Sequence, residues 1–336
     1  MEKSFWKIST SPDELTEGLF GQVVLWIFEI LPYLHKKSIY PSWDIKSKLY
    51  GTAPEYTIIP GVFDLAYTPT NLIDRDVREF SLTELRNDHT CILGGDWDYL
   101  HKLWHSYFKV PERIIIEADR IDLPLNSLGI HYRGNDKNQS SWDTNPVSQS
   151  DFLTLVKDFL KNHQEIESIF LATDEFSFVE NAMQQLYPLK IISLGEVGFH
   201  KAHINESQKG DRALLDCVLL SRCKYLLKCS SALSAFVKIL NRDVESYRVS
   251  ASKLFCDNPY FPEAYIPKLT STDPECIKIL EKQFANDWLD SSYAKLRFGK
   301  CFKTKSRYLF LIKSINSIKF KRLTKFKRWL KGVKPD

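Results

Sequence analysis

Basic side chains and a glycine follow a short apolar run near the middle of the chain. The segment reads His131-Tyr-Arg133-Gly134-Asn-Asp136-Lys137. An arginine presents a planar fork to phosphate oxygens, and a lysine adds a point charge. Asp136 can hold one of these cations in position. The segment predicts a site for a diphosphate, although an ion-pair network on a surface loop would leave the same pattern.

Two further polar clusters come directly after apolar runs. The run FLATDE ends in Thr173 and Asp174, and Ser230-Ser231 precedes an apolar helical pattern. Free backbone N–H groups at a helix start, together with two hydroxyls, can hold a phosphate. Each cluster also has a plainer interpretation, because Thr, Asp and Ser commonly cap the helix that follows them.

One carboxylate stands in an unfavourable sequence context. Asp216 lies early in the largely apolar segment Arg212–Leu220, which has a helical pattern. An unpaired carboxylate is costly to bury, so a partner is expected. The N–H edge of a guanine base would serve as that partner, and so would a nearby protein cation.

The elements that position these clusters alternate in type. Apolar runs typical of strands begin at Leu128, Glu167, Leu189 and Tyr225, and helical patterns lie between and after them. The pattern at 151–162 has apolar residues at i, i+3, i+4, i+7 and i+8, with Ser150 or Asp151 as its expected N-cap. Such alternation predicts a parallel, doubly wound sheet. Ligands of such sheets bind outside the carboxyl ends of the strands, where the polar clusters fall.

The first third of the chain carries weaker signals. Gly18-Leu-Phe-Gly21-Gln22 leads into a helical pattern, and its exposed N–H groups can face a substrate or simply form a turn. Residues 40–80 predict loops and short strands, and Asp96–Phe108 predicts an aromatic helix. Charges and a proline at 117–126 place a domain boundary there. We therefore divide the chain into 1–122, 123–290 and 291–336.

Several classes of protein are excluded. The chain has 336 residues. It contains no run of about 20 uncharged apolar residues, so no transmembrane helix is expected. The N-terminal residues lack the apolar core that a signal peptide requires, so no signal peptide is expected. The seven cysteines include no C-x-x-C pair, so reduced thiols are expected. No P-loop or G-x-G-x-x-G pattern is present, which argues against a P-loop nucleotidase and a dinucleotide enzyme.

The C-terminal segment is strongly basic. From Lys295 onward there are fifteen Lys/Arg and one acid, whereas the preceding 294 residues carry 31 basic and 41 acidic residues. Cations alternate with Leu, Ile, Phe and Trp in this segment. A basic amphipathic helix on an anionic membrane surface fits this pattern best. Packing of a helix against the body and binding of nucleic acid are the alternatives, and the acidic body disfavours nucleic acid.

Taken together, the three clusters resemble motifs of the superfamily of GDP-fucose-dependent fucosyltransferases, which includes nodulation and core α-1,6-fucosyltransferases. GIHYRGNDK is similar to the first motif, FLATDE to the second, and LLDCVLLSRCKYLLKCSSALS to the third. The match covers about residues 127–240. GLFGQ is weakly similar to the start of that family.

The resemblance implies a fold, a reaction and a set of residue roles. It implies a GT-B-type α/β architecture, with two Rossmann-like domains facing a cleft and the donor held mainly by the second. It implies an inverting transfer that needs no metal and no cofactor. Arg133 would bind the β-phosphate of GDP-fucose, and His131 and Asp216 would contact guanosine. Asp136, Lys137, Thr173, Asp174, Ser230 and Ser231 would complete the donor site, and Gly18, Gly21 and Gln22 would lie on the acceptor side.

The chain departs from the family pattern at two positions. Gly134 stands where the family has a second arginine, and Ser141 stands where the core-type enzymes have a carboxylate. We take Asp143 as the candidate catalytic base, beside Arg133 and Lys137 as the other catalytic candidates. Asp174 or an acid of the N-terminal domain is the alternative base.

These observations predict a fucosyltransferase that acts on a surface polysaccharide or a lipid-linked oligosaccharide. It would work at the cytoplasmic face of the membrane, held there by the basic tail, with no nucleic-acid partner. A transferase for another nucleotide sugar and a non-catalytic module that binds nucleotide sugars or glycans are the alternatives. The acceptor, the linkage and the oligomeric state are not encoded in these motifs.

Overall fold

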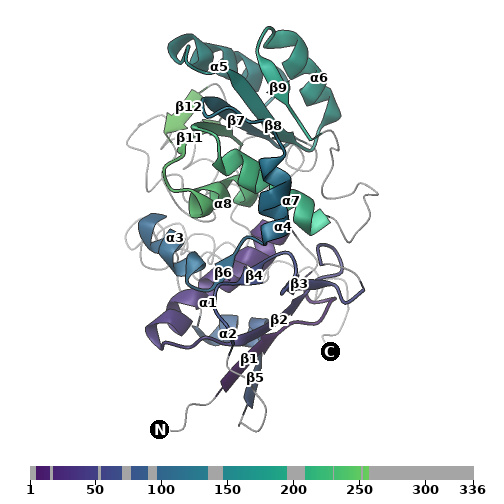
Figure 1. Cartoon of the computed structure of the whole chain (residues 1–336), viewed down its shortest axis with the longest axis vertical. Coiled ribbons are helices and arrows are strands. Elements are labelled where there is room, and N and C mark those ends of the chain that lie inside the picture. Colours follow the sequence, from purple (N-terminus) through teal and green to yellow (C-terminus); the bar gives the residue numbers. More distant parts are fainter. Residues whose placement is uncertain are drawn as a thin grey trace, which may run out of the picture.

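The computed structural model gives an α/β protein built around two sheets (Figure 1). The part of the chain that it describes comprises residues 5–15, 18–51, 54–69, 77–89, 97–134, 147–194, 209–229, 231–250 and 253–256. The basic segment 291–336 therefore lies outside the described residues. The described elements of the first third of the chain lie at one end of the view, and the larger sheet lies at the other.

The larger sheet has six strands in the order β12-β11-β10-β7-β8-β9. Their bounds are β7 Ser127–Tyr132, β8 Ser168–Thr173, β9 Lys190–Ile192, β10 Tyr225–Lys228, β11 Glu245–Ser250 and β12 Lys253–Cys256. Neighbouring strands are parallel except at the β11–β12 pair. Every residue of β7, β8 and β10 is buried, as expected of parallel strands covered on both faces. The predicted parallel sheet is confirmed.

Helices cover both faces of this sheet. These are α5 (Gln149–Asn162), α6 (Phe176–Gln185), α7 (Lys209–Ser221) and α8 (Ala232–Leu240). Leu128, Ile130 and Tyr132 share a core with apolar residues of α5 and α6, whereas Phe170 and Leu226 share one with α7 and α8. Successive residues of β7 therefore face different helix pairs, which is the alternation that a strand imposes.

Helix α5 begins earlier than the apolar pattern predicts. Its N-cap is Ser148, whose Oγ accepts a hydrogen bond from the Asp151 N–H at 3.0 Å. The expectation of Ser150 or Asp151 as N-cap is thus wrong by two or three positions. The reason is that Gln149, Ser150 and Asp151 form a polar first turn, which carries no apolar periodicity to mark it.

The smaller sheet has the order β3-β2-β1-β5, with only β3 antiparallel to its neighbour. Its strands are β1 Phe5–Ser9, β2 Ser42–Lys46, β3 Thr57–Ile59 and β5 Val77–Ser81, and β4 Asp64–Leu65 pairs separately with β6 Phe108–Lys109. The associated helices are η1 Leu19–Val24, a π-helix, α1 Leu25–Lys36, α2 Leu82–His89, α3 Trp97–His105 and α4 Glu112–Asp119. Short strands between 40 and 80 and an aromatic helix after Asp96 are confirmed, although Phe108 belongs to β6.

One hydrophobic core joins the two halves of the chain. Phe236 of α8 is fully buried, with its ring centroid 5.1 Å from that of Phe20, 5.9 Å from Phe63 and 4.9 Å from Trp104. These aromatic contacts tie η1, α3 and the β3–β4 connection to the larger sheet. The predicted division after residue 122 falls between α4 and β7 and stays a prediction.

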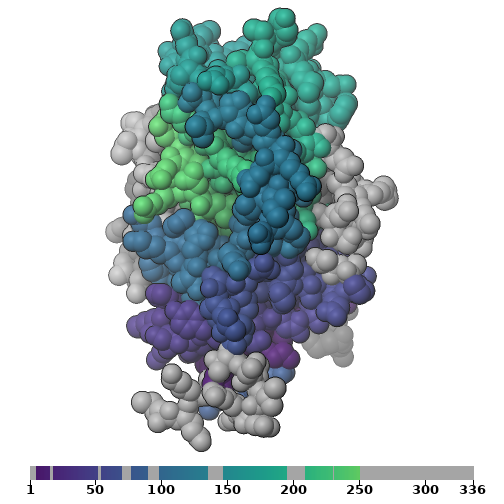
Figure 2. Space-filling model, viewed as in Figure 1, coloured from purple at the N-terminus to yellow at the C-terminus, as the bar shows by residue number. Residues whose placement is uncertain are grey.

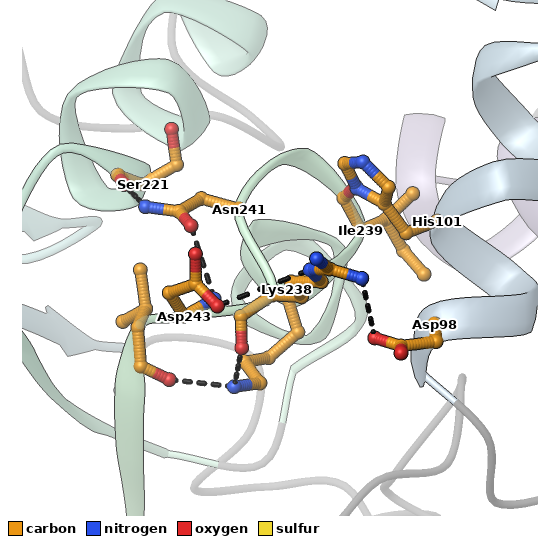
Figure 3. Close-up of polar contacts among 9 residues, drawn as sticks. Asp98, His101, Ser221, Lys238, Ile239, Asn241 and Asp243 are labelled. Atoms are coloured by element: carbon orange, nitrogen blue, oxygen red, sulfur yellow. Dashed lines mark hydrogen bonds and ion pairs between the residues drawn. The ribbon is translucent and has the colours of Figure 1, made fainter.

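Polar contacts reinforce this junction at the C-terminal end of α8. His101 Nδ1 lies 2.7 Å from the Ile239 carbonyl oxygen, and Arg242 Nη1 donates to Asp98 at 2.9 Å (Figure 3). On the visible face of the space-filling view, atoms from the two halves abut (Figure 2). The junction is therefore a packed interface at this end of α8.

Replacing Phe236 with alanine tests whether the two halves share one core. Truncating a buried phenylalanine leaves a cavity and is expected to lower the free energy of unfolding by about 3–5 kcal/mol. When urea unfolding is followed by fluorescence and by circular dichroism, both probes should show one transition, shifted to a lower urea concentration in the variant. The control is Leu125→Ala, at a residue that is 88% exposed, which should change stability by less than about 0.5 kcal/mol. Two separate transitions in the wild-type protein would contradict a shared core.

Candidate active site

The candidate site lies at the carboxyl edge of the larger sheet. Tyr132 at the end of β7 pairs in register with Thr173 of β8, and His131 pairs with Lys228 of β10. Because the three strands are parallel neighbours, the residues that follow them are brought to one edge. The structure thus brings Arg133 and Asp174 together, as the sequence predicts for clusters that follow neighbouring strands.

Asp174 binds both the side chain and the backbone that follow β7. Its Oδ2 lies 3.7 Å from Arg133 Nε, and its Oδ1 accepts a hydrogen bond from the Gly134 N–H at 2.9 Å. The carboxylate is 9% exposed and the arginine side chain 21% exposed. One carboxylate therefore contacts both the backbone of Gly134 and the guanidinium of Arg133.

Glu175 occupies the space next to Gly134. A Cβ atom added at Gly134 would lie only 2.1 Å from Glu175 Oε1. The other carboxylate oxygen, Oε2, accepts a hydrogen bond from Gln149 Nε2 at 2.6 Å. A larger residue at position 134 would have to displace this anchored carboxylate. This contact gives a physical reason for the glycine where the resemblance leads one to expect a second arginine.

The Cys229 thiol, which sequence reasoning missed, lies among these groups. Its pKa is raised to about 12, mainly by burial and also by the charges of Asp174 and Glu175, whereas a hydrogen bond with the Arg133 backbone and the charge of Lys228 oppose the shift. The thiol is therefore neutral at physiological pH and acts as packing beneath the site. No feature of the sequence distinguishes this cysteine from the others.

Three basic residues lie in register near the carboxyl ends of β7, β10 and β11. Lys228 pairs with His131 on one side and with Arg248 of β11 on the other, so their side chains share one face of the sheet. They are 5% exposed or less. Of the three, only His131 was identified from the sequence. The row places basic side chains beneath the carboxyl ends of the strands.

Asp216 has a protein cation as its partner. Its Oδ1 lies 3.8 Å from Nε of Arg212, one turn earlier on α7. Burial raises the pKa of Asp216 to about 7, and the charge of Arg212 opposes this shift. Of the two partners expected for this carboxylate, the structure supplies the protein cation. A contact with a guanine base stays a prediction.

The remaining described candidates have local structural roles. Thr173 Oγ1 accepts a hydrogen bond from the Glu175 N–H at 3.1 Å, next to the start of α6. Ser231 is 5% exposed and is the N-cap residue of α8 by position, but its side chain makes no capping hydrogen bond. The expectation that Thr173 or Asp174 caps α6 is wrong, because the N-cap residue is Glu175 and no side chain makes a capping hydrogen bond there. Ser231 stands at the start of a helix as expected.

The glycine-rich segment near the N-terminus forms the π-helix η1. Gly18 is its N-cap, and the Gln22 N–H donates to the Gly18 carbonyl at 2.8 Å. A Cβ at Gly21 would meet nothing within 4 Å, so close packing does not require a glycine there. Gln22 is 6% exposed. Short π-helical turns are frequent at functional sites, and the acceptor-side role of this segment stays a prediction.

Four predicted site residues lie outside the described part of the chain, namely Asp136, Lys137, Asp143 and Ser230. Within the described residues, no three His, Cys, Asp or Glu side chains gather closely enough to hold a metal ion. Of the helices that the structure describes, none has the length and hydropathy needed to cross a bilayer.

Comparison with known proteins finds similarity only at the level of structure. No protein-family model and no curated protein matches the sequence. The chain is similar to NodZ α-1,6-fucosyltransferase crystallised with GDP, with 14% identity and a TM-score of 0.46 over 76% of this chain and 99% of that one. NodZ is a Bradyrhizobium protein.

Two further solved structures show the same kind of likeness. POFUT1 in complex with GDP has 11% identity and a TM-score of 0.44, covering 74% of this chain and 98% of that one. Arabidopsis thaliana FUT1 in complex with GDP has 9% identity and a TM-score of 0.43, covering 75% and 72%. At such low identities and TM-scores, the likeness does not assign an activity to this chain.

The raised pKa of Asp216 makes stability depend on pH. Between its unfolded value of 3.8 and about 7, the folded protein holds a proton that the unfolded chain has lost. The contribution of this group to the free energy of unfolding therefore falls as pH rises from about 4 to about 7. Asp216→Asn removes this titration. In urea unfolding, its stability relative to the wild type should rise between pH 4 and pH 8; a constant difference would contradict the burial of a titrating Asp216.

Proposed function

We propose that this chain is a glycosyltransferase that transfers fucose from GDP-fucose to a glycan acceptor. The observation that carries the proposal is the orientation of Arg133 by Asp174 at the carboxyl edge of a parallel sheet. An arginine with its side chain still 21% exposed, at the place where such sheets bind ligands, is suited to a diphosphate. The sequence motifs supply the choice of GDP-fucose.

The proposed chemistry depends on stabilising the leaving group. When the bond from the sugar to the diphosphate breaks, negative charge develops on the β-phosphate oxygen, and pre-oriented donors lower the free energy of that state. Arg133 supplies a cation, and the N-terminus of α8 after Ser231 supplies backbone N–H groups. Lys137, Asp136 and Ser230 would complete this set, and His131, Thr173 and Asp216 would lie on the nucleotide side.

The finer features of the proposal follow from the resemblance. The reaction would invert the configuration of the sugar and use no metal or other cofactor. The two halves would face each other across a GT-B-type cleft, with Gly18, Gly21 and Gln22 on the acceptor side. The enzyme would act at the cytoplasmic face of the membrane on a polysaccharide or lipid-linked acceptor.

Two alternative functions would use the same binding site at the carboxyl ends of the strands. A different nucleotide sugar is one, because none of the motif residues reads the sugar itself. A non-catalytic module that binds nucleotide sugars is the other, and one observation favours it. Glu175 lies where the side chain of a second arginine would begin, so this part of the site carries a negative charge in place of a positive one.

Binding of guanosine diphosphate tests the proposal. By titration calorimetry, wild-type protein should bind GDP more tightly than UDP or ADP. Arg133→Ala should weaken GDP binding about 10- to 100-fold, because a charge-assisted pair with phosphate is lost. Arg120→Ala, at an exposed arginine after α4, is the matched control and should bind as the wild type does. Equal binding of the three nucleotides by the wild type would contradict the choice of donor.

Removal of residues 305–336 tests the proposed membrane contact. Each cation near an anionic surface contributes about 1 kcal/mol, so the full chain should sediment with vesicles rich in phosphatidylserine and much less with neutral vesicles. The shortened chain should remain in the supernatant in both cases. Vesicle binding that survives the deletion would overturn the membrane role of the tail. Binding of the full chain to RNA or DNA in preference to vesicles would favour the nucleic-acid alternative.

A further inference from the structure

Two carboxylates stand side by side at the candidate site, and their surroundings differ. Asp174 is 9% exposed, with one oxygen on the Gly134 N–H and the other facing Arg133 Nε. Its negative charge is offset by a cation and a backbone donor. These two contacts hold the carboxylate against the residues that follow β7, so Asp174 is suited to positioning Arg133.

Among the residues that the structure describes, Glu175 is anchored through one oxygen. Gln149 Nε2 donates to Oε2 at 2.6 Å and lies 2.9 Å from Ser177 Oγ, and Asn181 Nδ2 donates to Gln149 Oε1 at 2.6 Å. The anchoring glutamine is therefore itself held by α6. No hydrogen-bond donor of the described chain contacts Glu175 Oε1, the oxygen that lies against Gly134.

This arrangement has the features of a positioned proton acceptor. The carboxylate is half-buried, Oε2 is held by Gln149, and Oε1 lies against Gly134, the residue after the arginine that would meet the diphosphate. The absence of a side chain at residue 134 leaves the space that this oxygen occupies. Glycine at position 134 therefore provides the space that the side chain of Glu175 requires.

We propose that Glu175 is the catalytic base of the transfer, a proposal that rests on the proposed function. The acceptor oxygen attacks the anomeric carbon of the sugar as the bond from that carbon to the diphosphate oxygen breaks, and the bonding electron pair leaves with GDP. The proton of the acceptor hydroxyl passes to Glu175 Oε1 and from there to solvent. Asp174 and Gln149 are positioning residues, for Arg133 and Glu175 respectively.

The test compares two small acceptors, of which one needs a base and the other does not. Water must lose a proton when it attacks GDP-fucose, whereas azide is an anion with no proton to lose. Glu175→Gln keeps an oxygen that can accept from Gln149 but cannot take a proton. We expect the variant to release GDP by hydrolysis about 10²–10⁴-fold more slowly than the wild type. Formation of fucosyl azide, followed by mass spectrometry, should proceed as in the wild type.

The control and the binding measurement separate failure of this proposal from failure of the proposed function. Glu180→Gln, an exposed glutamate on the same helix, should hydrolyse the donor as the wild type does. Calorimetry should show unchanged GDP affinity in Glu175→Gln. Unchanged hydrolysis in Glu175→Gln would overturn the base assignment and leave the proposed function intact. Loss of the azide reaction or of GDP binding in this variant would also overturn it, since Glu175 would then belong to the donor site.

The wild type decides the remaining outcomes. A wild type that binds GDP but turns over neither water nor azide would overturn the base assignment and favour the non-catalytic module. A wild type that does not bind GDP would overturn the proposed function, and the base assignment would fall with it.

Discussion

The contact between Asp174 and the residues that follow β7 is the interaction on which the candidate site depends. A parallel β7–β8 pair brings residues 41 positions apart in the sequence to one edge, and the carboxylate joins them there. The carboxylate faces the Arg133 guanidinium and accepts the backbone N–H of Gly134, so it helps to orient both. Strand pairing positions the groups, and the short-range electrostatic contact orients them.

The charges around this contact are divided between two sides. His131, Lys228 and Arg248 form a buried row on the face of the sheet that α7 and α8 cover, whereas Glu175 lies against Gly134 beside α5. A group-transfer site needs this kind of division, because a departing diphosphate requires positive charge and an entering hydroxyl requires a proton acceptor. The glycine at 134 makes the division possible by leaving room for a carboxylate.

The sequence carried enough information to predict the sheet and its functional edge. Alternating apolar runs and helical patterns indicate parallel strands, and polar residues directly after those runs indicate the edge. It did not carry the contact between Gly134 and Glu175, because the two residues meet only through the pairing of β7 with β8. Lys228 and Arg248 were also missed, since a cation inside an apolar run gives no sign of which cations lie beside it on neighbouring strands. The N-cap at Ser148 was missed because a polar first turn has no periodicity.

The account rests on the recognition of a diphosphate by Arg133, and a thermodynamic cycle measures that recognition directly. Affinities for GDP and GMP would be determined for the wild type and for Arg133→Lys, which keeps the charge but loses the planar fork. The account predicts that the wild type prefers GDP over GMP and that the variant loses most of this preference, so that the two changes are strongly coupled. An Arg133→Lys protein that retains the full preference for GDP would contradict the account.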